Sequence, residues 1–130
     1  MKYVDVVAAV IYDGDKILIT KRSGGEFDGM WEFPGGKIES GETHREALER
    51  ELMEELSIGA SMEQYLMTLT HQYETFHLTM HLYWTKIVSG TLTLNEHSDF
   101  KWISKEELDG VNWVPADVVV VERIIESNFL

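Results

Sequence analysis

Cysteine is absent from this sequence, and proline occurs only 2 times in 130 residues. Without cysteine the chain has no disulfide framework, no thiolate metal site and no cysteine nucleophile. Long apolar runs are missing too, because the longest one, residues 6–12, falls far short of the roughly 20 residues that a membrane helix needs. The N-terminus also lacks the charged-then-apolar pattern of a secretory signal. We therefore expect a cytoplasmic protein that does not associate with membranes.

Positive charge is scarce. The sequence has 11 lysines and arginines against 23 aspartates and glutamates, so its formal net charge is −12. This charge disfavours binding to polymeric DNA or RNA and to anionic membranes, although a small phosphorylated ligand can bind if metal ions neutralise it. The length predicts one domain over residues 1–130, and the sequence leaves open whether the protein is a monomer or a homodimer.

The first strands are indicated by two apolar segments. Residues 3–12 are almost continuously apolar and β-branched, which predicts a strand buried on both faces at the centre of a helix-covered sheet. An Asp-Gly pair follows and predicts a hairpin turn. Residues 16–20 form the returning strand and carry Lys21 and Arg22 to its end. These two cations either lie on the surface or hold phosphate or a base.

A second, longer hairpin is predicted at residues 65–73 and 76–87. Its second arm alternates apolar with polar residues, which predicts one core face and one polar or site-lining face. Several histidines lie in this hairpin. A histidine metal site is the less favoured interpretation, because no third soft ligand pairs with them and histidines on a polar face are common.

The C-terminal part predicts a short strand at residues 99–103, a helical turn opened by Ser104, and a helix over residues 116–127 that follows Pro115. Four apolar residues of this helix are expected to pack on the core: Val118, Val121, Ile124 and Ile125.

A glycine loop containing Gly35 and Gly36 leads into an acidic helix predicted at residues 43–56, where Thr43 and Glu46 have the form of a capping box. The glycines permit positive φ and close approach of the backbone to a ligand, or simply a tight turn before the helix. Three leucines form one stripe on the helix and three glutamates lie beside it: Leu48, Leu52 and Leu56, and Glu51, Glu54 and Glu55.

Acidic residues so close to a buried stripe repel one another. A like-charge pair such as Glu51 and Glu55 destabilises an isolated helix by roughly 0.2–0.5 kcal/mol, and a bound cation removes that penalty. Clustered carboxylates suit Mg²⁺, Mn²⁺ or Ca²⁺. The alternative interpretation is a solvated acidic helix.

Gly36, Glu42 and residues 50–58 (RELMEELSI) resemble the signature of the Nudix hydrolase family, whose spacing is highly specific. One position departs, because Ser57 stands where the family has glycine; this predicts a slightly strained helix end without loss of chemistry. Further segments, including residues 31–39 and 115–117, resemble MutT-type nucleoside triphosphate pyrophosphohydrolases, so the likeness covers nearly the whole chain. It implies an α/β (α+β) fold, a Nudix-type α/β/α sandwich with a central mixed β-sheet.

The resemblance also implies the reaction: attack of metal-activated water on a phosphorus, which converts a nucleoside triphosphate to the monophosphate plus pyrophosphate in nucleotide-pool sanitation. Mg²⁺ is the implied cofactor, and Mn²⁺ can substitute. The implied metal ligands are a backbone carbonyl of Gly35 or Gly36 and the side chains of Glu51, Glu54, Glu55 and Glu96. We expect Arg50 to orient the acids by salt bridging. The general base stays open among Glu51, Glu96 and Glu42, in that order.

Recognition of the nucleotide is implied to involve Arg22, Phe33, Lys37 and Asp117. An ionised Asp117 only accepts hydrogen bonds, which favours a base with an amino or N–H edge. Cytosine derivatives fit, because residues 115–117 resemble CTP-type pyrophosphohydrolases, and an oxidised guanine fits as well. The alternative is that Asp117 is a first-turn acid stabilised by the helix dipole.

Two other functions compete with this one. The first is a Nudix hydrolase of nucleotide sugars or dinucleoside polyphosphates, which would release products other than pyrophosphate. The second is a non-catalytic nucleotide- or Ca²⁺-sensing module, which the intact set of acids disfavours.

Overall fold

The computed structural model describes residues 1–130 and contains one seven-stranded sheet in the order β3-β2-β1-β6-β5, with β4 paired to β1 and β7 paired to β2. The parallel pairing of β1 with β6 makes the sheet mixed, because its other pairs are antiparallel. The strands are β1 (Lys2–Asp13), β2 (Lys16–Lys21), β3 (Trp31–Glu32), β4 (Gly35–Lys37), β5 (Ile58–Gln72), β6 (Phe76–Gly90) and β7 (Asp99–Ser104).

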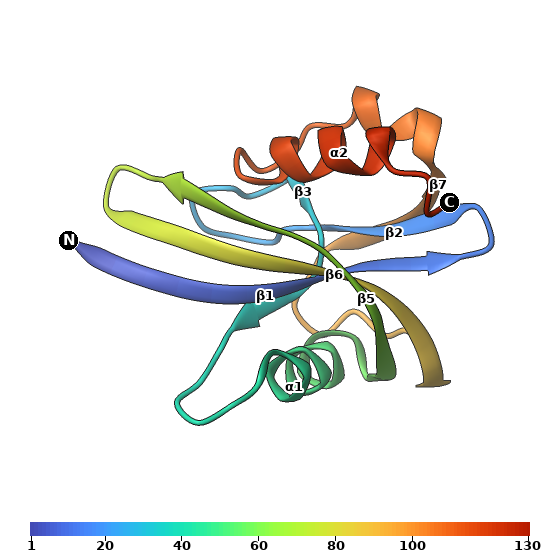
Figure 1. Ribbon diagram of the computed structural model, residues 1–130, viewed down its shortest axis with the longest axis horizontal. Coiled ribbons are helices and arrows are strands. Elements are labelled where there is room, and N and C mark those ends of the chain that lie inside the picture. Colours follow the sequence, from blue (N-terminus) through green and yellow to red (C-terminus); the bar gives the residue numbers. More distant parts are fainter.

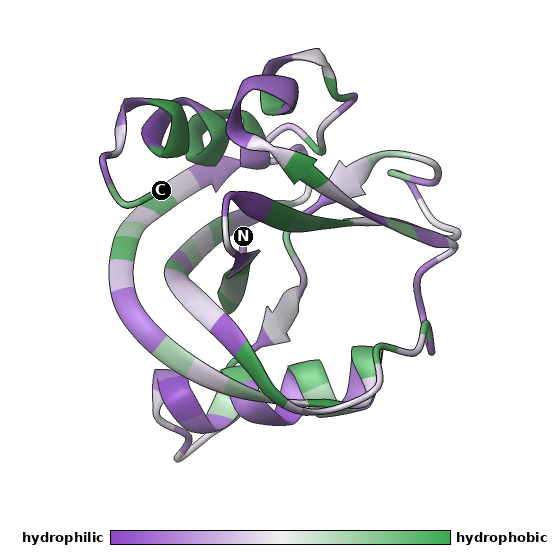
Figure 2. Cartoon of the chain, turned by 90° about the vertical axis from the view of Figure 1, so that its right-hand side faces the viewer, coloured by the Kyte–Doolittle hydropathy of each residue, from purple (hydrophilic) through white to green (hydrophobic).

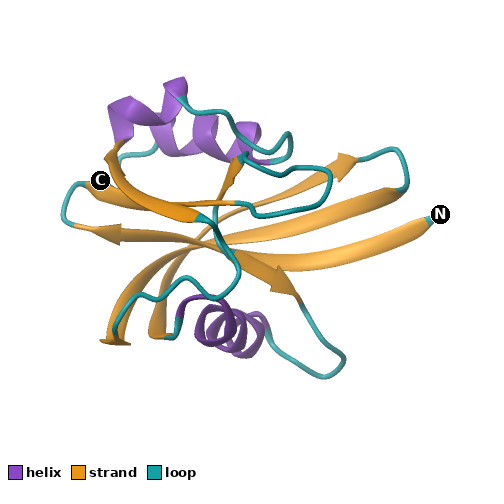
Figure 3. Cartoon of the chain, turned by 180° about the vertical axis from the view of Figure 1, so that it is seen from behind, coloured by secondary structure: helices purple, strands orange, loops and turns teal.

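The two α-helices, α1 (His44–Leu56) and α2 (Asp117–Glu126), lie on opposite sides of the sheet (Figure 1; Figure 3 gives the view from behind). A short 3₁₀ helix, η1 (Lys105–Gly110), precedes α2. This arrangement is the predicted three-layer sandwich. No helix combines the length and the apolar character that crossing a membrane requires.

Strand β1 supplies both halves of the core, as its continuous apolar sequence predicts. Val7, Ala9 and Ile11 pack in the cluster that contains the leucines of α1, whereas Ala8 and Val10 belong to the cluster that contains the buried residues of α2. The alternation follows from the two-residue period of a strand, which sends neighbouring side chains to opposite faces. The prediction of a strand buried on both faces over residues 3–12 is confirmed for residues 7–11, whereas Tyr3 is 75% exposed.

Helix α1 begins at the capping box that the sequence predicts: the Glu46 backbone N–H donates to Thr43 Oγ1, and the Thr43 N–H donates to the Glu46 carboxylate. The helix ends at Ser57, which adopts the left-handed conformation with φ 58° and ψ 35°. Asn95 supports this end, because its Nδ2 donates to Ser57 Oγ and to the Glu54 carbonyl, each over 2.9 Å. The expectation of a strained cap is confirmed.

The terminal helix shows one error of the sequence prediction. Val118 and Ile125 are exposed, at 45% and 43%, although both were expected to pack on the core. The buried face consists of Asp117, Val120, Val121 and Ile124, because the helix starts at Asp117 and its phase turns the first valine outward. Both hydrophobic and hydrophilic residues occur in each of the two helices (Figure 2).

The second hairpin is longer than predicted, although its turn lies after Tyr73 as expected. Strand β5 starts directly after α1 and carries register shifts near residues 59–60, 62–64 and 65–67. Such irregularities bend and twist a strand. Strands β3 and β4 were not predicted, because they are only 2 and 3 residues long. They place the glycine loop on the edge of the cleft described next.

Candidate active site

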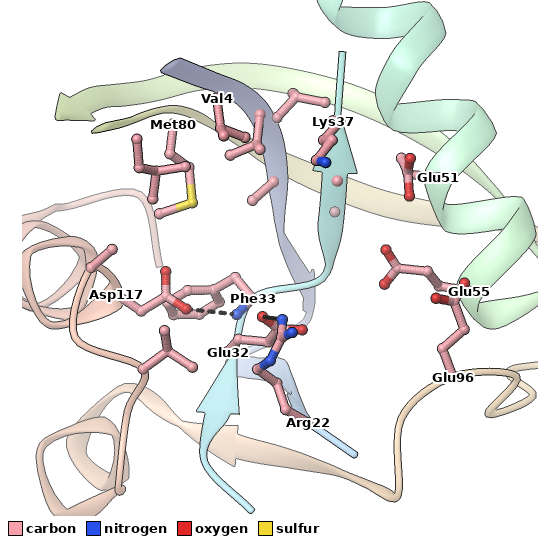
Figure 4. A pocket seen from close by; sticks show the side chains of 18 of the residues that line it. Val4, Arg22, Glu32, Phe33, Lys37, Glu51, Glu55, Met80, Glu96 and Asp117 are labelled. Carbon is pink, nitrogen blue, oxygen red and sulfur yellow. Dashed lines mark hydrogen bonds and ion pairs between the residues drawn. The ribbon is translucent and has the colours of Figure 1, made fainter. Parts of the chain in front are cut away.

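A cleft of about 630 Å³ opens between α1 and the segment that leads into α2. Glu51, Glu55 and Glu96 lie at one end of it, whereas Asp117 and Phe33 lie at the other (Figure 4). Every site residue predicted from the sequence lines this cleft except Glu42. The structure therefore brings together the predicted phosphate and base contacts, and it places Glu42 behind Arg50.

Two glycines let the cleft floor approach α1. Gly35 and Gly36 pair with Ala8 and Val7 of β1, and neither has a positive φ, so that part of the prediction is wrong. The close approach that the structure shows is to other parts of the protein: a Cβ on Gly36 would overlap the carboxylate of Glu51, and one on Gly35 would overlap the backbone of Val7. The glycines are needed here for space, not for an unusual backbone conformation.

Arg50 is the centre of an ion-pair network. Its guanidinium donates to both carboxylate oxygens of Glu42, at 2.7 and 2.8 Å, to Glu51 Oε1 at 2.8 Å and to the carbonyl of Lys37 at 2.9 Å. A weaker contact of 3.4 Å reaches Glu54. The hydrogen bond from Arg50, followed by one from the Glu39 backbone, lowers the pKa of Glu42 to about 2. These contacts fit the expected orienting role of Arg50.

Glu55 has the opposite electrostatics. Its side chain is buried, and this burial, together with the nearby charges of Glu32, Glu51 and Glu96, raises its pKa to about 9. Glu55 is therefore protonated at neutral pH in the free protein. A buried neutral acid among other carboxylates is a common feature of sites that bind a cation or move a proton.

The acidic end fits a divalent cation in its donor chemistry. All its donors are oxygens, which Mg²⁺, Mn²⁺ and Ca²⁺ prefer. In this arrangement no three acidic or histidine side chains lie close enough together to hold a metal ion. Glu51 accepts a hydrogen bond from Arg50, and the raised pKa of Glu55 favours its protonated form. A bound cation would replace that proton and relieve the repulsion between the carboxylates.

The other end of the cleft differs from expectation at Asp117. This side chain is buried, accepts a hydrogen bond from the Phe33 backbone N–H over 3.3 Å, and has a pKa raised well above its usual value by burial and then by Glu32. This direction favours a neutral Asp117 in the free protein, whereas the sequence predicts an ionised one. A neutral carboxyl carries one O–H donor as well as acceptors.

Phe33 lines the same end, with its ring stacked on Trp113 at 4.9 Å between centroids. Arg22 lies between the two ends of the cleft, where its NH1 donates to Glu32 Oε1 over 3.0 Å (Figure 4). Lys37 contributes an exposed side chain to the wall. Lys21 is the other cation predicted at the end of β2. Its ammonium group lies over the ring of Trp31, 6.0 Å from the ring centroid.

Sequence reasoning missed two residues of this cleft, Glu32 and His97. Glu32 binds Arg22 through one oxygen and His97 Nε2 through the other, at 2.9 Å. The signal for Glu32 was a single acid inside an otherwise apolar segment, and the signal for His97 was its position next to Glu96. Neither signal is specific without the three-dimensional arrangement.

Comparison with known proteins identifies the family of this chain. The model of the NUDIX domain matches residues 2–124. The chain belongs to the NUDIX family. The predicted family, the mixed α/β fold and the hydrolase class are thereby confirmed, and NUDIX hydrolases generally use divalent metal ions.

Three relatives illustrate the likeness. The CTP pyrophosphohydrolase of Escherichia coli is 40% identical over 128 residues, which cover 96% of this NUDIX chain and 93% of the relative. The putative 8-oxo-dGTP diphosphatase 2 of Mycobacterium tuberculosis is 36% identical over 117 residues, covering 86% and 81%. Among solved structures, the E. coli ORF135 protein has a TM-score of 0.84 and 36% identity, and covers 97% of this chain and 91% of its own.

Proposed function

We propose that this protein is a divalent-cation-dependent nucleoside triphosphate pyrophosphohydrolase that produces a nucleoside monophosphate and pyrophosphate, and that it sanitises the nucleotide pool as a single domain. One observation carries the proposal: a single cleft has crowded carboxylates at one end and a buried carboxyl group, Asp117, at the other. The names of the relatives, a CTP pyrophosphohydrolase and an 8-oxo-dGTP diphosphatase, support this class of substrate.

Glu51, Glu54, Glu55 and Glu96 would hold the cation together with a backbone carbonyl of Gly35 or Gly36. Mg²⁺ is the proposed ion, and Mn²⁺ can substitute. When bound, such an ion neutralises charge on the polyphosphate and activates water. Glu51 and Glu55 line the cleft directly against Gly36 and beside Glu96, respectively (Figure 4), which supports this set of ligands.

The protein groups then position and deprotonate water. A water oxygen forms a bond to phosphorus, one bond of the bridge between the α- and β-phosphates breaks, and the proton of the water passes to a carboxylate. Glu51 is our first candidate for this base, followed by Glu96. Glu42 becomes the weakest candidate, because it lies outside the cleft with both oxygens bound to Arg50.

Base recognition would rest on Asp117, Arg22 and Phe33, with Lys37 beside the phosphates. A neutral Asp117 can donate one hydrogen bond and accept another side by side. The cytosine edge, with N3 as acceptor and the amino group as donor, complements that pair. An oxidised guanine also offers adjacent donors and acceptors, so both classes belong in the test.

A nucleotide panel tests this function. Ordinary and oxidised nucleoside triphosphates, nucleotide sugars and dinucleoside polyphosphates are incubated with the protein and Mg²⁺, and the products are separated. The proposal requires pyrophosphate and nucleoside monophosphate in equal amounts, and no product after chelation of the metal. Release of a sugar phosphate or of inorganic phosphate would assign the cleft to another nucleoside diphosphate derivative. A cytoplasmic location and the choice between monomer and homodimer stay predictions from the sequence.

A further inference from the structure

Arg22, Glu32 and His97 form a continuous polar chain along the cleft wall, which we call the polar relay. Arg22 NH1 donates to Glu32 Oε1 over 3.0 Å, and Glu32 Oε2 lies 2.9 Å from His97 Nε2. The same imidazole nitrogen is 3.7 Å from Glu55 Oε2. The polar relay therefore leads from Arg22, between the two ends of the cleft, toward the carboxylates of α1.

The position of His97 is fixed by its neighbours on both sides. The Asn95 N–H donates to the Glu55 carbonyl, and the Ser98 N–H donates to the Lys21 carbonyl, each over 3.0 Å. The loop between β6 and β7 is thus attached to the end of α1 and to the end of β2. The side chain of His97 is only 5% exposed, and these backbone hydrogen bonds on either side of it restrict its position.

The distances show which carboxylate is hydrogen-bonded to His97. A separation of 2.9 Å is a hydrogen bond, whereas 3.7 Å is too long for one. Glu32 already accepts a hydrogen bond from Arg22, and an ionised carboxylate has no donor of its own. A hydrogen on His97 Nε2 completes this contact, and we assign His97 as the donor that holds Glu32.

Both buried side-chain atoms without a partner belong to the polar relay. They are Arg22 Nε and His97 Nδ1. An unpaired buried donor or acceptor is unfavourable, and native proteins keep few of them. These two atoms lie at the two ends of the polar relay, in residues that line the cleft. This arrangement indicates that the polar relay contributes to ligand binding and not only to the fold.

We propose that His97 is a positioning residue of the nucleotide site: its Nε2–H holds the Glu32 carboxylate, and Glu32 in turn fixes the Arg22 guanidinium toward the bound nucleotide. This inference rests on the proposed function. It assigns His97 to substrate binding and not to the chemical step, because its hydrogen bond is to Glu32 and its contact with Glu55 is too long for one.

The test compares His97→Leu with His97→Gln. Leucine fills a similar volume without a donor, whereas glutamine places an N–H at nearly the same reach as Nε2. For the nucleoside triphosphate that the wild type hydrolyses best, we expect His97→Leu to raise KM about tenfold with kcat within about threefold, the pattern of lost uniform binding. His97→Gln should restore KM to within about threefold of wild type.

Three further measurements separate positioning from a general structural effect. The dissociation constant of a non-hydrolysable nucleoside triphosphate should rise in parallel with KM. In an Arg22→Ala background His97→Leu should add less than about twofold, because coupled residues are not additive. His77→Leu is the control, since His77 bonds Gln72 outside the cleft and its loss should leave KM unchanged.

The outcomes are distinct. A wild-type protein that releases no pyrophosphate overturns the proposed function and this inference together. A wild type that releases it, with an unchanged KM in His97→Leu or no rescue by glutamine, overturns the inference alone. If His97→Leu fails to fold, long-range ¹H–¹⁵N NMR of the wild-type imidazole decides: hydrogen on Nε2 supports the polar relay, and hydrogen only on Nδ1 refutes it.

Discussion

The guanidinium of Arg50 binds Glu42 at two points, with Nε 2.7 Å from Oε2 and NH2 2.8 Å from Oε1. Glu42 precedes α1, and Arg50 belongs to it, so this pair joins the loop to the helix. The remaining nitrogen, NH1, lies 2.8 Å from Glu51 Oε1. One planar group therefore sets the position of the carboxylate that we propose as the base.

Arg50→Lys should lower activity strongly. An ammonium group cannot reproduce the two parallel hydrogen bonds to Glu42 and the third to Glu51. Loss of such supporting contacts around a metal site typically reduces metal affinity or activity by roughly 10–100-fold, and we expect that range in kcat/KM. Arg45→Lys, at an exposed position of the same helix, should have no effect. Equal activity of both variants would refute the role of Arg50.

Ser57→Gly should stabilise the protein. Ser57 holds the left-handed conformation at the end of α1, where a side chain is unfavourable by roughly 1–2 kcal/mol and glycine is not. The exposed hydrogen bond from Asn95 to Ser57 Oγ offsets part of this, so we expect a gain of about 0.5–1 kcal/mol in the free energy of unfolding. Chemical denaturation measures it. Ser57→Ala, which keeps the strain and loses the hydroxyl, should be less stable than wild type.

The free energy of unfolding should depend on pH because the pKa of Glu55 differs between the folded and unfolded states. Its pKa is about 9 in the folded protein, against 4.5 as the usual value, so between these pH values the folded state retains a proton that the unfolded state has lost. The free energy of unfolding must therefore fall as the pH rises through this window. Added Mg²⁺ should oppose the fall, because it replaces the proton.

Glu55→Gln isolates this contribution. Without metal, the Tm of the wild type should drop more between about pH 5 and about pH 8 than the Tm of the variant, since glutamine cannot ionise. Glu54→Gln serves as the matched control, because that side chain is 54% exposed and its loss should leave the slope unchanged. Parallel Tm curves for the wild type and Glu55→Gln would show that Glu55 is ionised in the folded state.

Asp117 should govern which base is accepted. Asp117→Asn keeps an acceptor for the Phe33 N–H, so stability should stay within about 1 kcal/mol, while the fixed amide donor should change the ranking of nucleotides by kcat/KM. Asp117→Ala leaves that N–H unpaired and should destabilise the fold by about 1–3 kcal/mol. Denaturation and the nucleotide panel measure both effects. An unchanged ranking in both variants would remove Asp117 from base recognition.

The sequence predicted the elements whose signals are local. The capping box of α1, the leucine stripe and the two-sided burial of β1 all follow from residues close together in the chain. The phase of α2 was wrong because two registers of its valines and isoleucines look equally apolar. Only the packing of Val120, Val121 and Ile124 decides between them.

The electrostatics of the cleft could not be predicted from spacing. Burial and then the charge of Glu32 raise the pKa of Asp117, and the same two causes raise the pKa of Glu55, although Glu32 lies on β3 and Glu55 on α1. Glu32 and His97 meet across 65 residues of sequence. Such contacts arise from strand pairing and loop attachment, which no local pattern encodes.

The most direct test of the account is the turnover of Glu51→Gln, measured as pyrophosphate and nucleoside monophosphate released with Mg²⁺. Glutamine keeps the size of Glu51 but loses its charge and basicity, so kcat should fall by at least about 10²-fold in a variant that still folds. Circular dichroism and the Tm establish the fold. Near-normal turnover in a folded Glu51→Gln protein would contradict the assignment of this cleft as a carboxylate-based nucleotide hydrolase site.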